Sequence, residues 1–332
     1  MTLIIAEAGV NHNGDIGLAK ELVDIASESG ADIVKFQTFK AEEIVTNKAE
    51  KAIYQKKSQS DSSDQLSMLK KLELSYDEFE ELRDYCDIRS IEFLSTGFSI
   101  ESLKFLISLD IRRIKIPSGE ITNYPLLLSA SRYGLPIILS SGLSHMFEVE
   151  KAVNILKGKS EKDNHITVLH CTTEYPAPLK SVNLSAMRSI EKNIGVDIGY
   201  SDHTTNFEVP IAAVAAGATI IEKHFTKSRK LDGPDHSASL EPNELSAMVS
   251  SIRNTEILLG SSEKKPSPEE LKNLEVIRKS IVAKKKIEKG DLLNEDNLTT
   301  KRPGNGLSPM QWDNLIDTLA IKQFEKDDLI EI

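Results

Sequence analysis

Eight short apolar stretches recur along the first 260 residues, each followed by a polar or glycine-containing turn and then by a segment with helical spacing. The stretches are LIIAEAG (3–9), DIVKFQTF (32–39), IEFLSTGF (91–98), RRIKIPSG (112–119), PIILSSG (136–142), ITVLHCTTEYP (166–176), VDIGYSD (196–202) and ATIIEKHFT (218–226). Near-continuous Val, Ile and Leu runs are typical of strands buried on both faces of a parallel sheet. The pattern predicts eight parallel strands.

The segments between these strands have the features of helices. In DIGLAKELVDIASESG (15–30), Asp15 can cap the helix start and Gly30 suits the position after its end. One helical face carries the apolar residues Leu18, Leu22, Ile25 and Ala26. Eight strand–helix units predict an α/β fold of the (β/α)8 TIM-barrel type over residues 1–260, with the active site at the carboxyl ends of the strands. A doubly wound open sheet is the alternative, but no GxGxxG follows the first strand.

Two further segments stand apart from this repeat. Residues 40–75 are longer than a strand–helix loop requires, and their polar composition indicates a surface excursion that can act as a lid. After Gly260, a polar, proline-containing linker with a short helix spans 261–280 and leads into a small domain at 281–332. Within that domain AKKKIEKGDLL (283–293) is similar to AIKQFEKDDLI (320–330), which predicts a compact β-rich module of two duplicated halves.

Composition narrows the class of protein. The formal net charge of −10 argues against a nucleic-acid partner and against an anionic membrane surface. The two cysteines, Cys86 and Cys171, cannot form a disulfide framework, which suits a reducing compartment. The amino terminus lacks the basic leader of a signal peptide, and no stretch approaches the ~20 apolar residues of a membrane span. We therefore expect a cytoplasmic protein.

Polar side chains gather where the predicted strands end. Hydroxyl groups from several strands, together with the charge of Lys35, can hold a phosphate; these hydroxyls belong to Ser95, Thr96, Ser118, Ser140, Ser141, Thr172, Thr173 and Ser201. Each hydroxyl alone has a second interpretation as a helix cap, and Lys35 as a solvated lysine at the rim. Together they would form a ring at one end of the barrel, where hydroxyls donate hydrogen bonds and Lys35 supplies charge.

Two histidines, His203 and His224, follow the seventh and eighth strands, which are neighbours in a closed barrel. Imidazoles from adjacent strands can share one divalent ion, and Glu7 on the first strand can face the same ion directly or through water. Two neutral histidines with oxygen ligands suit Mn²⁺, Zn²⁺, Fe²⁺ or Co²⁺. In the loop GPDHSASLEP (233–242), Asp235 and His236 are either a simple turn or substrate contacts.

Several motifs in order along the chain resemble the sialic-acid (nonulosonic acid) synthase family: IAEAGVNHNG, VKFQTF, KIPSGEITNYPLL, HCTTEYPAP, GYSDHT, IEKHFT, GPDHSASLEP and KRPGNG. AEAGVNHNG, FQTFKAE and HCTTEYPAPL are most similar to its N,N′-diacetyllegionaminate synthase branch, with the N-acetylneuraminate synthase branch next. The tail resembles the antifreeze-like (SAF) domain, a β-clip fold. The resemblance implies condensation of phosphoenolpyruvate with an N-acetylated mannose-type sugar, with release of phosphate. The expected sugar is 2,4-diacetamido-2,4,6-trideoxymannose, and N-acetylmannosamine is the alternative.

The resemblance also implies roles for individual residues. His203 and His224 would bind the metal, most often Mn²⁺ with Mg²⁺ or Co²⁺ as substitutes, and Glu7 would lie beside it. Phosphoenolpyruvate would be held by Lys35, Thr96, Ser118, Ser140 and Ser201. The acceptor sugar would contact Gln37, Glu120, Tyr175 and Asp235, together with Arg302 from the other subunit of a domain-swapped homodimer. The sequence departs from the family pattern at Thr173, where some members have Asn, and at Gly97, where proline is frequent.

Two other functions are compatible with parts of the sequence. A Schiff-base aldolase would use Lys35 as its nucleophile. A non-catalytic carbohydrate-binding protein would use the barrel only as a scaffold, but the joint presence of Glu7, Lys35, His203, His224 and Asp235 argues against an inactive protein.

Overall fold

The computed structural model describes residues 1–46, 49, 64–158 and 165–332. The chain divides into two compact units, Met1–Gly260 and Ser261–Ile332. Each unit has a hydrophobic core of its own.

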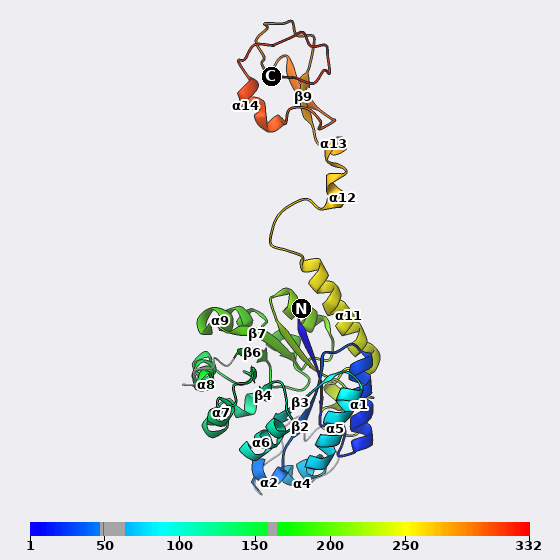
Figure 1. The fold of residues 1–332 in the computed structure, drawn as a ribbon, viewed down its shortest axis with the longest axis vertical. Helices are drawn as coiled ribbons and strands as arrows, with labels where there is room; N and C mark the ends of the chain where they lie inside the picture. The colour runs from blue at the N-terminus through cyan, green and yellow to red at the C-terminus, as the bar shows by residue number, and fades with distance from the viewer. Residues whose placement is uncertain (47–48, 50–63, 159–164) are drawn as a thin grey trace. The chain divides into compact units, whose positions relative to one another are not determined.

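In the first unit, eight parallel strands close into a barrel in sequence order, which confirms the predicted α/β barrel (Figure 1). The strands are β1 (Leu3–Gly9), β2 (Ile33–Thr38), β3 (Glu92–Gly97), β4 (Ile114–Ile116), β5 (Ile137–Ser140), β6 (Ile166–Cys171), β7 (Asp197–Asp202) and β8 (Ile220–His224). The helices around them are α1 (Ile16–Glu28), α5 (Tyr76–Ile88), α6 (Ile100–Ser108), α7 (Tyr124–Ala130), α8 (Met146–Lys157), α9 (Ser185–Ile194), α10 (Glu208–Ala215) and α11 (Pro242–Leu259). None of the described helices has the length and apolar character needed to cross a membrane.

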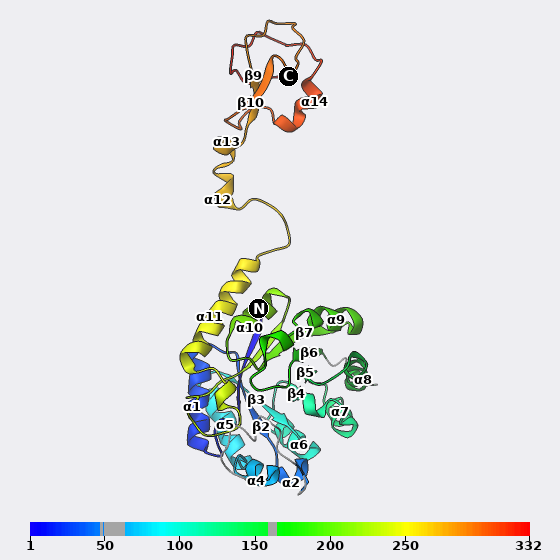
Figure 2. The ribbon, with the colours of Figure 1, turned by 180° about the vertical axis from the view of Figure 1, so that it is seen from behind.

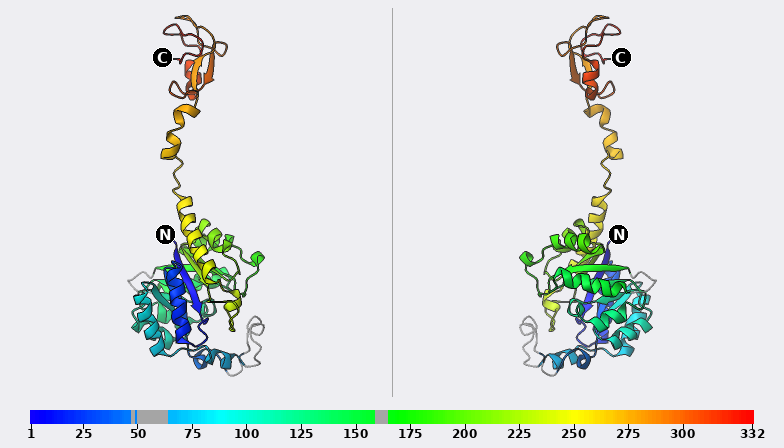
Figure 3. Two further views of the ribbon diagram at one scale, coloured as in Figure 1. Left: turned by 90° about the vertical axis from the view of Figure 1, so that its right-hand side faces the viewer. Right: turned by 90° about the vertical axis from the view of Figure 1, so that its left-hand side faces the viewer.

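Helix α1 forms for the reasons that the sequence predicts. The Leu18 amide donates a 2.9 Å hydrogen bond to Asp15 Oδ1, and Gly30 ends the helix in the left-handed region at φ +78°. Residues Leu22 and Ala26 are buried, whereas Leu18 and Ile25 are only half-buried. Helix α1 lies along β1 (Figure 3), and α11 packs against both α1 and α10 (Figure 2).

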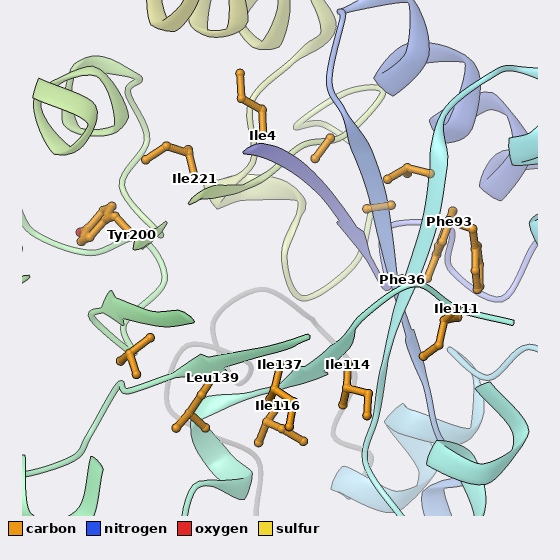
Figure 4. Packing of buried hydrophobic residues seen from close by; sticks show 14 of the residues in the cluster. Ile4, Phe36, Phe93, Ile111, Ile114, Ile116, Ile137, Leu139, Tyr200 and Ile221 are labelled. Atoms are coloured by element: carbon orange, nitrogen blue, oxygen red, sulfur yellow. The ribbon is translucent and has the colours of Figure 1, made fainter. Parts of the chain in front are cut away.

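The barrel strands have two different faces. Outward-facing side chains such as Ile4, Phe36, Leu139 and Tyr200 pack beneath the helices (Figure 4). Inside the barrel, one apolar layer consists of Ile5, Ile33, Leu94, Ile138, Leu169 and Ile220. Because side chains alternate along a strand, the residue two positions later also points inward, nearer the carboxyl end. This rule places Glu7, Lys35, Thr96, Ser140 and Glu222 above the apolar layer.

The segment at 40–75 falls partly outside the described residues, so its role as a lid stays a prediction. Its described parts include the short helices α2 (Ala41–Ile44) and α4 (Gln65–Lys70). Helices α2 and α4 contact each other. Short 3-10 turns complete the loops of the barrel: η1 (Ser118–Glu120), η2 (Leu179–Ser181) and η3 (His236–Ala238).

The second unit contains a small antiparallel sheet, as expected for a β-rich module. Its elements are α12 (Pro268–Leu271), α13 (Leu274–Ile277), β9 (Ser280–Ala283), β10 (Leu298–Lys301), η4 (Pro309–Gln311) and α14 (Trp312–Leu315). Ile287 and Phe324 hold equivalent places in the two similar stretches, and they exchange two backbone hydrogen bonds of 2.9 Å. Gly290 and Asp327 are also equivalent. The Gly290 amide donates a 2.8 Å hydrogen bond to the Ala320 carbonyl, and the Asp327 amide donates one of the same length to the Ala283 carbonyl. The two halves are therefore duplicated and pair with each other.

Candidate active site

A cavity of about 360 Å³ lies at the carboxyl ends of the strands. It is lined by all twelve barrel residues to which the family resemblance assigns a role: Glu7, Lys35, Gln37, Thr96, Ser118, Glu120, Ser140, Tyr175, Ser201, His203, His224 and Asp235. Another cavity, of about 390 Å³, lies at the amino ends of β3 and β4. In barrels of this type chemistry belongs to the carboxyl face, so the first cavity is the candidate active site.

Four buried charged side chains alternate in sign at the floor of this cavity. Lys35 Nζ forms an ion pair with Glu7 and lies 3.5 Å from Glu222 Oε2. On the other side, Lys115 Nζ lies 3.4 Å from Glu222 Oε1 and donates a 2.9 Å hydrogen bond to Ser140 Oγ. Because buried charges are costly unless paired, this alternation offsets the cost of burying two lysine side chains, although burial still lowers the pKa of Lys115.

The two carboxyl groups of this cluster have opposite pKa shifts. Burial raises the pKa of Glu7 to about 7, although the nearby Lys35 charge opposes this rise. Burial also acts to raise the pKa of Glu222, but the charges of Lys115 and Lys35 outweigh it and lower that pKa to about 2. A carboxyl group with a pKa near neutrality can both take and release a proton, so Glu7 is the acid–base candidate.

Hydroxyl groups surround the ammonium groups. Lys35 Nζ lies 3.2 Å from Thr96 Oγ1, and Ser201 Oγ donates a 2.8 Å hydrogen bond to Glu222 Oε1. Ser118 Oγ accepts a 2.9 Å hydrogen bond from the amide of Gly142. Within the described structure, the buried Thr173 hydroxyl has no hydrogen-bond partner. Two ammonium groups and several hydroxyls in one place suit a phosphate or carboxylate ligand.

The two histidines lie together, with ring centroids 5.8 Å apart. His203 Nδ1 lies 2.6 Å from the carbonyl oxygen of Thr172 and must donate to it, which leaves a lone pair on Nε2, 3.0 Å from the Tyr175 hydroxyl. Burial lowers the pKa of His203 and lowers that of His224 further. Both rings are therefore neutral, with His203 held in the tautomer that a metal ligand needs.

The surroundings of Gly9 show how closely this part of the site converges. A Cβ at Gly9 would meet Gln37 Nε2, Glu7 Oε1 and His224 Cε1, each at 3.3 Å. Gly9 also has φ +57°, a conformation that favours glycine. Across the part of the chain that the structure describes, no group of three or more His, Cys, Asp or Glu side chains is arranged to hold a metal ion. Two neutral imidazoles together with oxygen ligands are a donor set that suits a divalent ion.

Four of the five residues expected to contact the acceptor sugar line the cavity, and the fifth is Arg302. Gln37 Nε2 lies 3.3 Å from Glu7 Oε1, and burial raises the pKa of Asp235 to about 6. His236, the other candidate in this loop, does not line the cavity. Its Nδ1 forms a 2.7 Å hydrogen bond with Thr226 Oγ1 and so holds the loop that carries Asp235. Arg302 belongs to the second unit, where its Nε donates a 2.9 Å hydrogen bond to the Ile277 carbonyl.

The sequence interpretation gave no role to two charged residues of the site, Lys115 and Glu222. Lys115 stands in the apolar run IKI, where Ile114 and Ile116 face outward, so alternation alone would have pointed it into the barrel. Glu222 faces inward by the same rule, because it stands two residues after Ile220 of the inner apolar layer.

Comparisons with known proteins identify the family of the chain. Residues 22–264 match the NeuB family model, and residues 278–331 match the SAF domain model. The chain is 50% identical over 329 residues to the N,N′-diacetyllegionaminic acid synthase of Campylobacter jejuni, covering 99% of this chain and 98% of that protein. It is 48% identical over 316 residues to the enzyme of the same name from Legionella pneumophila, covering 94% and 88%.

Among solved structures, the chain is similar to N-acetylneuraminic acid synthetase from Leptospira borgpetersenii, with a TM-score of 0.74 and 35% identity. That likeness covers 82% of this chain and 90% of the other. The family match spans most of the barrel, and the identity to the C. jejuni enzyme extends over both units. This chain is therefore a member of the NeuB family with a carboxyl-terminal SAF domain.

Proposed function

We propose that this enzyme condenses phosphoenolpyruvate with the open-chain aldehyde of 2,4-diacetamido-2,4,6-trideoxymannose and water. The products are N,N′-diacetyllegionaminate and phosphate. The observation that carries the proposal is the buried cluster of Glu7, Lys35, Glu222 and Lys115 beside two neutral histidines. The names of the C. jejuni and L. pneumophila relatives support this choice of sugar.

In this reaction C3 of phosphoenolpyruvate forms a bond with the aldehyde carbon, and C2 becomes electron-poor. Water adds at C2, and Glu7 accepts its proton because burial holds the Glu7 pKa at about 7. This proton then passes to the alkoxide that the aldehyde oxygen has become, which restores Glu7. The resulting tetrahedral intermediate loses phosphate by cleavage of the C–O bond. The ammonium groups of Lys35 and Lys115, with the hydroxyls of the cavity, offset the charge on the departing phosphate.

We further propose that His203 and His224 hold a divalent cation, with Mn²⁺ as the first choice. Their neutral rings support this assignment, as does the lone pair on His203 Nε2, which the Tyr175 hydroxyl contacts at 3.0 Å. Such a cation would polarise the aldehyde carbonyl and so lower the cost of the developing alkoxide. Gln37 would orient Glu7, and Tyr175 would orient the ring of His203.

The remaining assignments concern the whole protein. We propose that residues 1–260 are the catalytic domain, 261–280 the linker and 281–332 the SAF domain. The enzyme would act as a domain-swapped homodimer in which Arg302 reaches the acceptor in the partner's barrel. A cytoplasmic location is supported by the two buried, unpaired cysteines, Cys86 and Cys171.

A phosphate-release assay tests the proposed function. The purified protein is given phosphoenolpyruvate with 2,4-diacetamido-2,4,6-trideoxymannose or with N-acetylmannosamine, and release is expected to be faster with the first sugar. Failure to release phosphate with either sugar would refute the proposal.

Borohydride trapping with pyruvate tests the Schiff-base alternative. It is expected to leave Lys35 unmodified, because Glu222 and Glu7 outweigh burial and raise the pKa of Lys35, which keeps its amine protonated. A covalent adduct on Lys35 would instead support the aldolase mechanism.

A further inference from the structure

The cavity of the candidate active site has two chemically different sides. Charged and hydroxyl groups line the side described above. The opposite side is formed by the loops after β1, β2 and β3 and by α4, and its described residues are apolar except for Gln65. We name as the apolar wall the six side chains of this side that form one hydrophobic cluster: Val10, Phe39, Ile44, Leu69, Leu72 and Phe98.

The apolar wall is held in place by its own packing. The rings of Phe39 and Phe98 pack edge to face, with centroids 6.1 Å apart and planes at 90°. Val10, Phe39 and Leu72 are buried, whereas Ile44, Leu69 and Phe98 are half-buried and offer surface to a ligand. The wall is therefore a formed surface within the described residues.

Polar contacts fix the two short helices that carry part of the wall. The amide of Ala41, at the start of α2, donates a 2.7 Å hydrogen bond to Glu73 Oε1. Lys70, at the end of α4, donates to Glu42 Oε1 at 2.5 Å. These contacts join α2 to α4 and to the chain just after α4, so Ile44 and Leu69 keep their places beside the cavity.

We infer that the apolar wall is the surface that selects the acceptor sugar, by contacting the methyl groups of its C4–C6 end. This inference rests on the proposed function. Of the two substrates, only the acceptor carries methyl groups. Phosphoenolpyruvate is a small anion, and the ammonium groups and hydroxyls of the polar side match it. The aldehyde carbon must lie on the polar side, where Lys35, Lys115 and the histidines are, so the far end of the sugar is free to meet the wall.

The two alternative sugars differ where the wall would act. 2,4-Diacetamido-2,4,6-trideoxymannose has a C6 methyl group and a C4 acetamido group. N-acetylmannosamine has hydroxyl groups at both positions. Moving a hydroxyl from water to an apolar surface without a new hydrogen bond raises the free energy of the complex. A single methyl-sized difference in an apolar pocket changes kcat/KM by about 10- to 200-fold. The wall is thus sufficient to favour the trideoxy sugar.

The test compares Leu69→Asn with Leu66→Asn. Both leucines are half-buried on α4, but Leu66 does not line the cavity, which makes it a matched control for damage to the helix. We expect Leu69→Asn to lower kcat/KM for the trideoxy sugar by about tenfold or more and to change kcat/KM for N-acetylmannosamine by less than about threefold. Leu66→Asn should leave the ratio of the two values unchanged.

Ile44→Thr, which shortens the side chain on α2 and introduces a hydroxyl, provides a second variant in case Leu69→Asn does not fold. It should shift the same ratio toward N-acetylmannosamine. A parallel loss with both sugars, or a wild-type enzyme that uses both equally, would overturn the inference but leave the proposed function intact. Absence of phosphate release by the wild type with either sugar would instead refute the proposed function.

Discussion

Lys223 and Asp202 form an ion pair in which both side chains are fully buried, with Nζ 2.5 Å from Oδ2. Lys223 Nζ also donates hydrogen bonds to the carbonyl oxygens of Thr204 and Asn206. Asp202 immediately precedes His203, and Lys223 immediately precedes His224. The pair therefore joins β7 and its following loop to β8 directly behind the two histidines.

Replacing either Lys223 or Asp202 should destabilise the fold, because the charge of the remaining residue stays buried without its counterion. We expect Lys223→Met and Asp202→Asn each to lower the free energy of unfolding by about 3–5 kcal/mol. The double variant should lose less than the sum of the two, since no uncompensated charge remains. Urea unfolding of the four proteins measures this coupling, and strictly additive losses would contradict it.

The barrel can be predicted from the sequence because apolar runs and helix-end residues are local features of the chain. Eight apolar runs predict eight strands, and Asp15 and Gly30 mark the two ends of the first helix as predicted. The exact strand ends do not follow as readily: the predicted runs 112–119 and 166–176 are longer than β4 and β6, which end at Ile116 and Cys171.

The charge pattern of the site depends on contacts between distant strands. Glu222 lies between Lys35 and Lys115, which stand on β2 and β4, and neither ion pair can be read from spacing along the chain. Similarly, Asp202 and Lys223 are 21 residues apart, and only the pairing of β7 with β8 brings them together. Family resemblance identifies single residues, but the pKa of Glu7 follows only from three-dimensional burial.

Metal binding can be measured without reference to activity. Calorimetric titration of the chelator-treated protein with Mn²⁺ should show binding that His203→Ala and His224→Ala each weaken by more than about 100-fold, since even indirect partners of a metal ligand contribute 10- to 100-fold. His170→Ala is the control, because the ring of His170 bonds the Val182 carbonyl and does not line the cavity. Unchanged affinity in both site variants would refute the two-histidine assignment.

Lys115 should serve phosphoenolpyruvate more than the acceptor sugar. Its buried Nζ contacts Ser140 and Glu222, so Lys115→Met removes one of the two lysine amino groups on the polar side. We expect the KM for phosphoenolpyruvate to rise by at least about tenfold, the scale of a lost charge-assisted hydrogen bond, with little change in the acceptor KM. Arg112→Met, an exposed change before β4, is the control. A rise confined to the acceptor KM would contradict this role.

Arg302 tests the contribution of the SAF domain. Arg302→Ala is expected to raise the KM for the acceptor sugar by about tenfold or more without changing the sedimentation of the protein, because one guanidinium contact in the proposed dimer is lost without a change in the core. The neighbouring Lys301→Ala, which breaks an exposed ion pair with Asp327, is the control. If only the KM for phosphoenolpyruvate changed, the acceptor role of Arg302 would be wrong.

Asp235 should give the stability of the enzyme a pH dependence opposite to that of a salt-bridged carboxyl group. Burial raises its pKa from 3.8 to about 6, so the folded state holds the proton more tightly than the unfolded state. Below pH 3.8 Asp235 is protonated in both states, so it does not reduce the free energy of unfolding. The reduction grows as the pH rises from 3.8 to about 6 and is complete above about pH 6.

The Asp235→Asn variant removes this cost. It should resemble the wild type in stability near pH 4 and exceed it near pH 7 by up to about 3 kcal/mol. Urea unfolding at both pH values measures the difference, with Asp232→Asn, an exposed change in the same loop, as the control. Equal gains at both pH values would show that the effect comes from packing, because only the ionised carboxylate carries the penalty that the amide avoids.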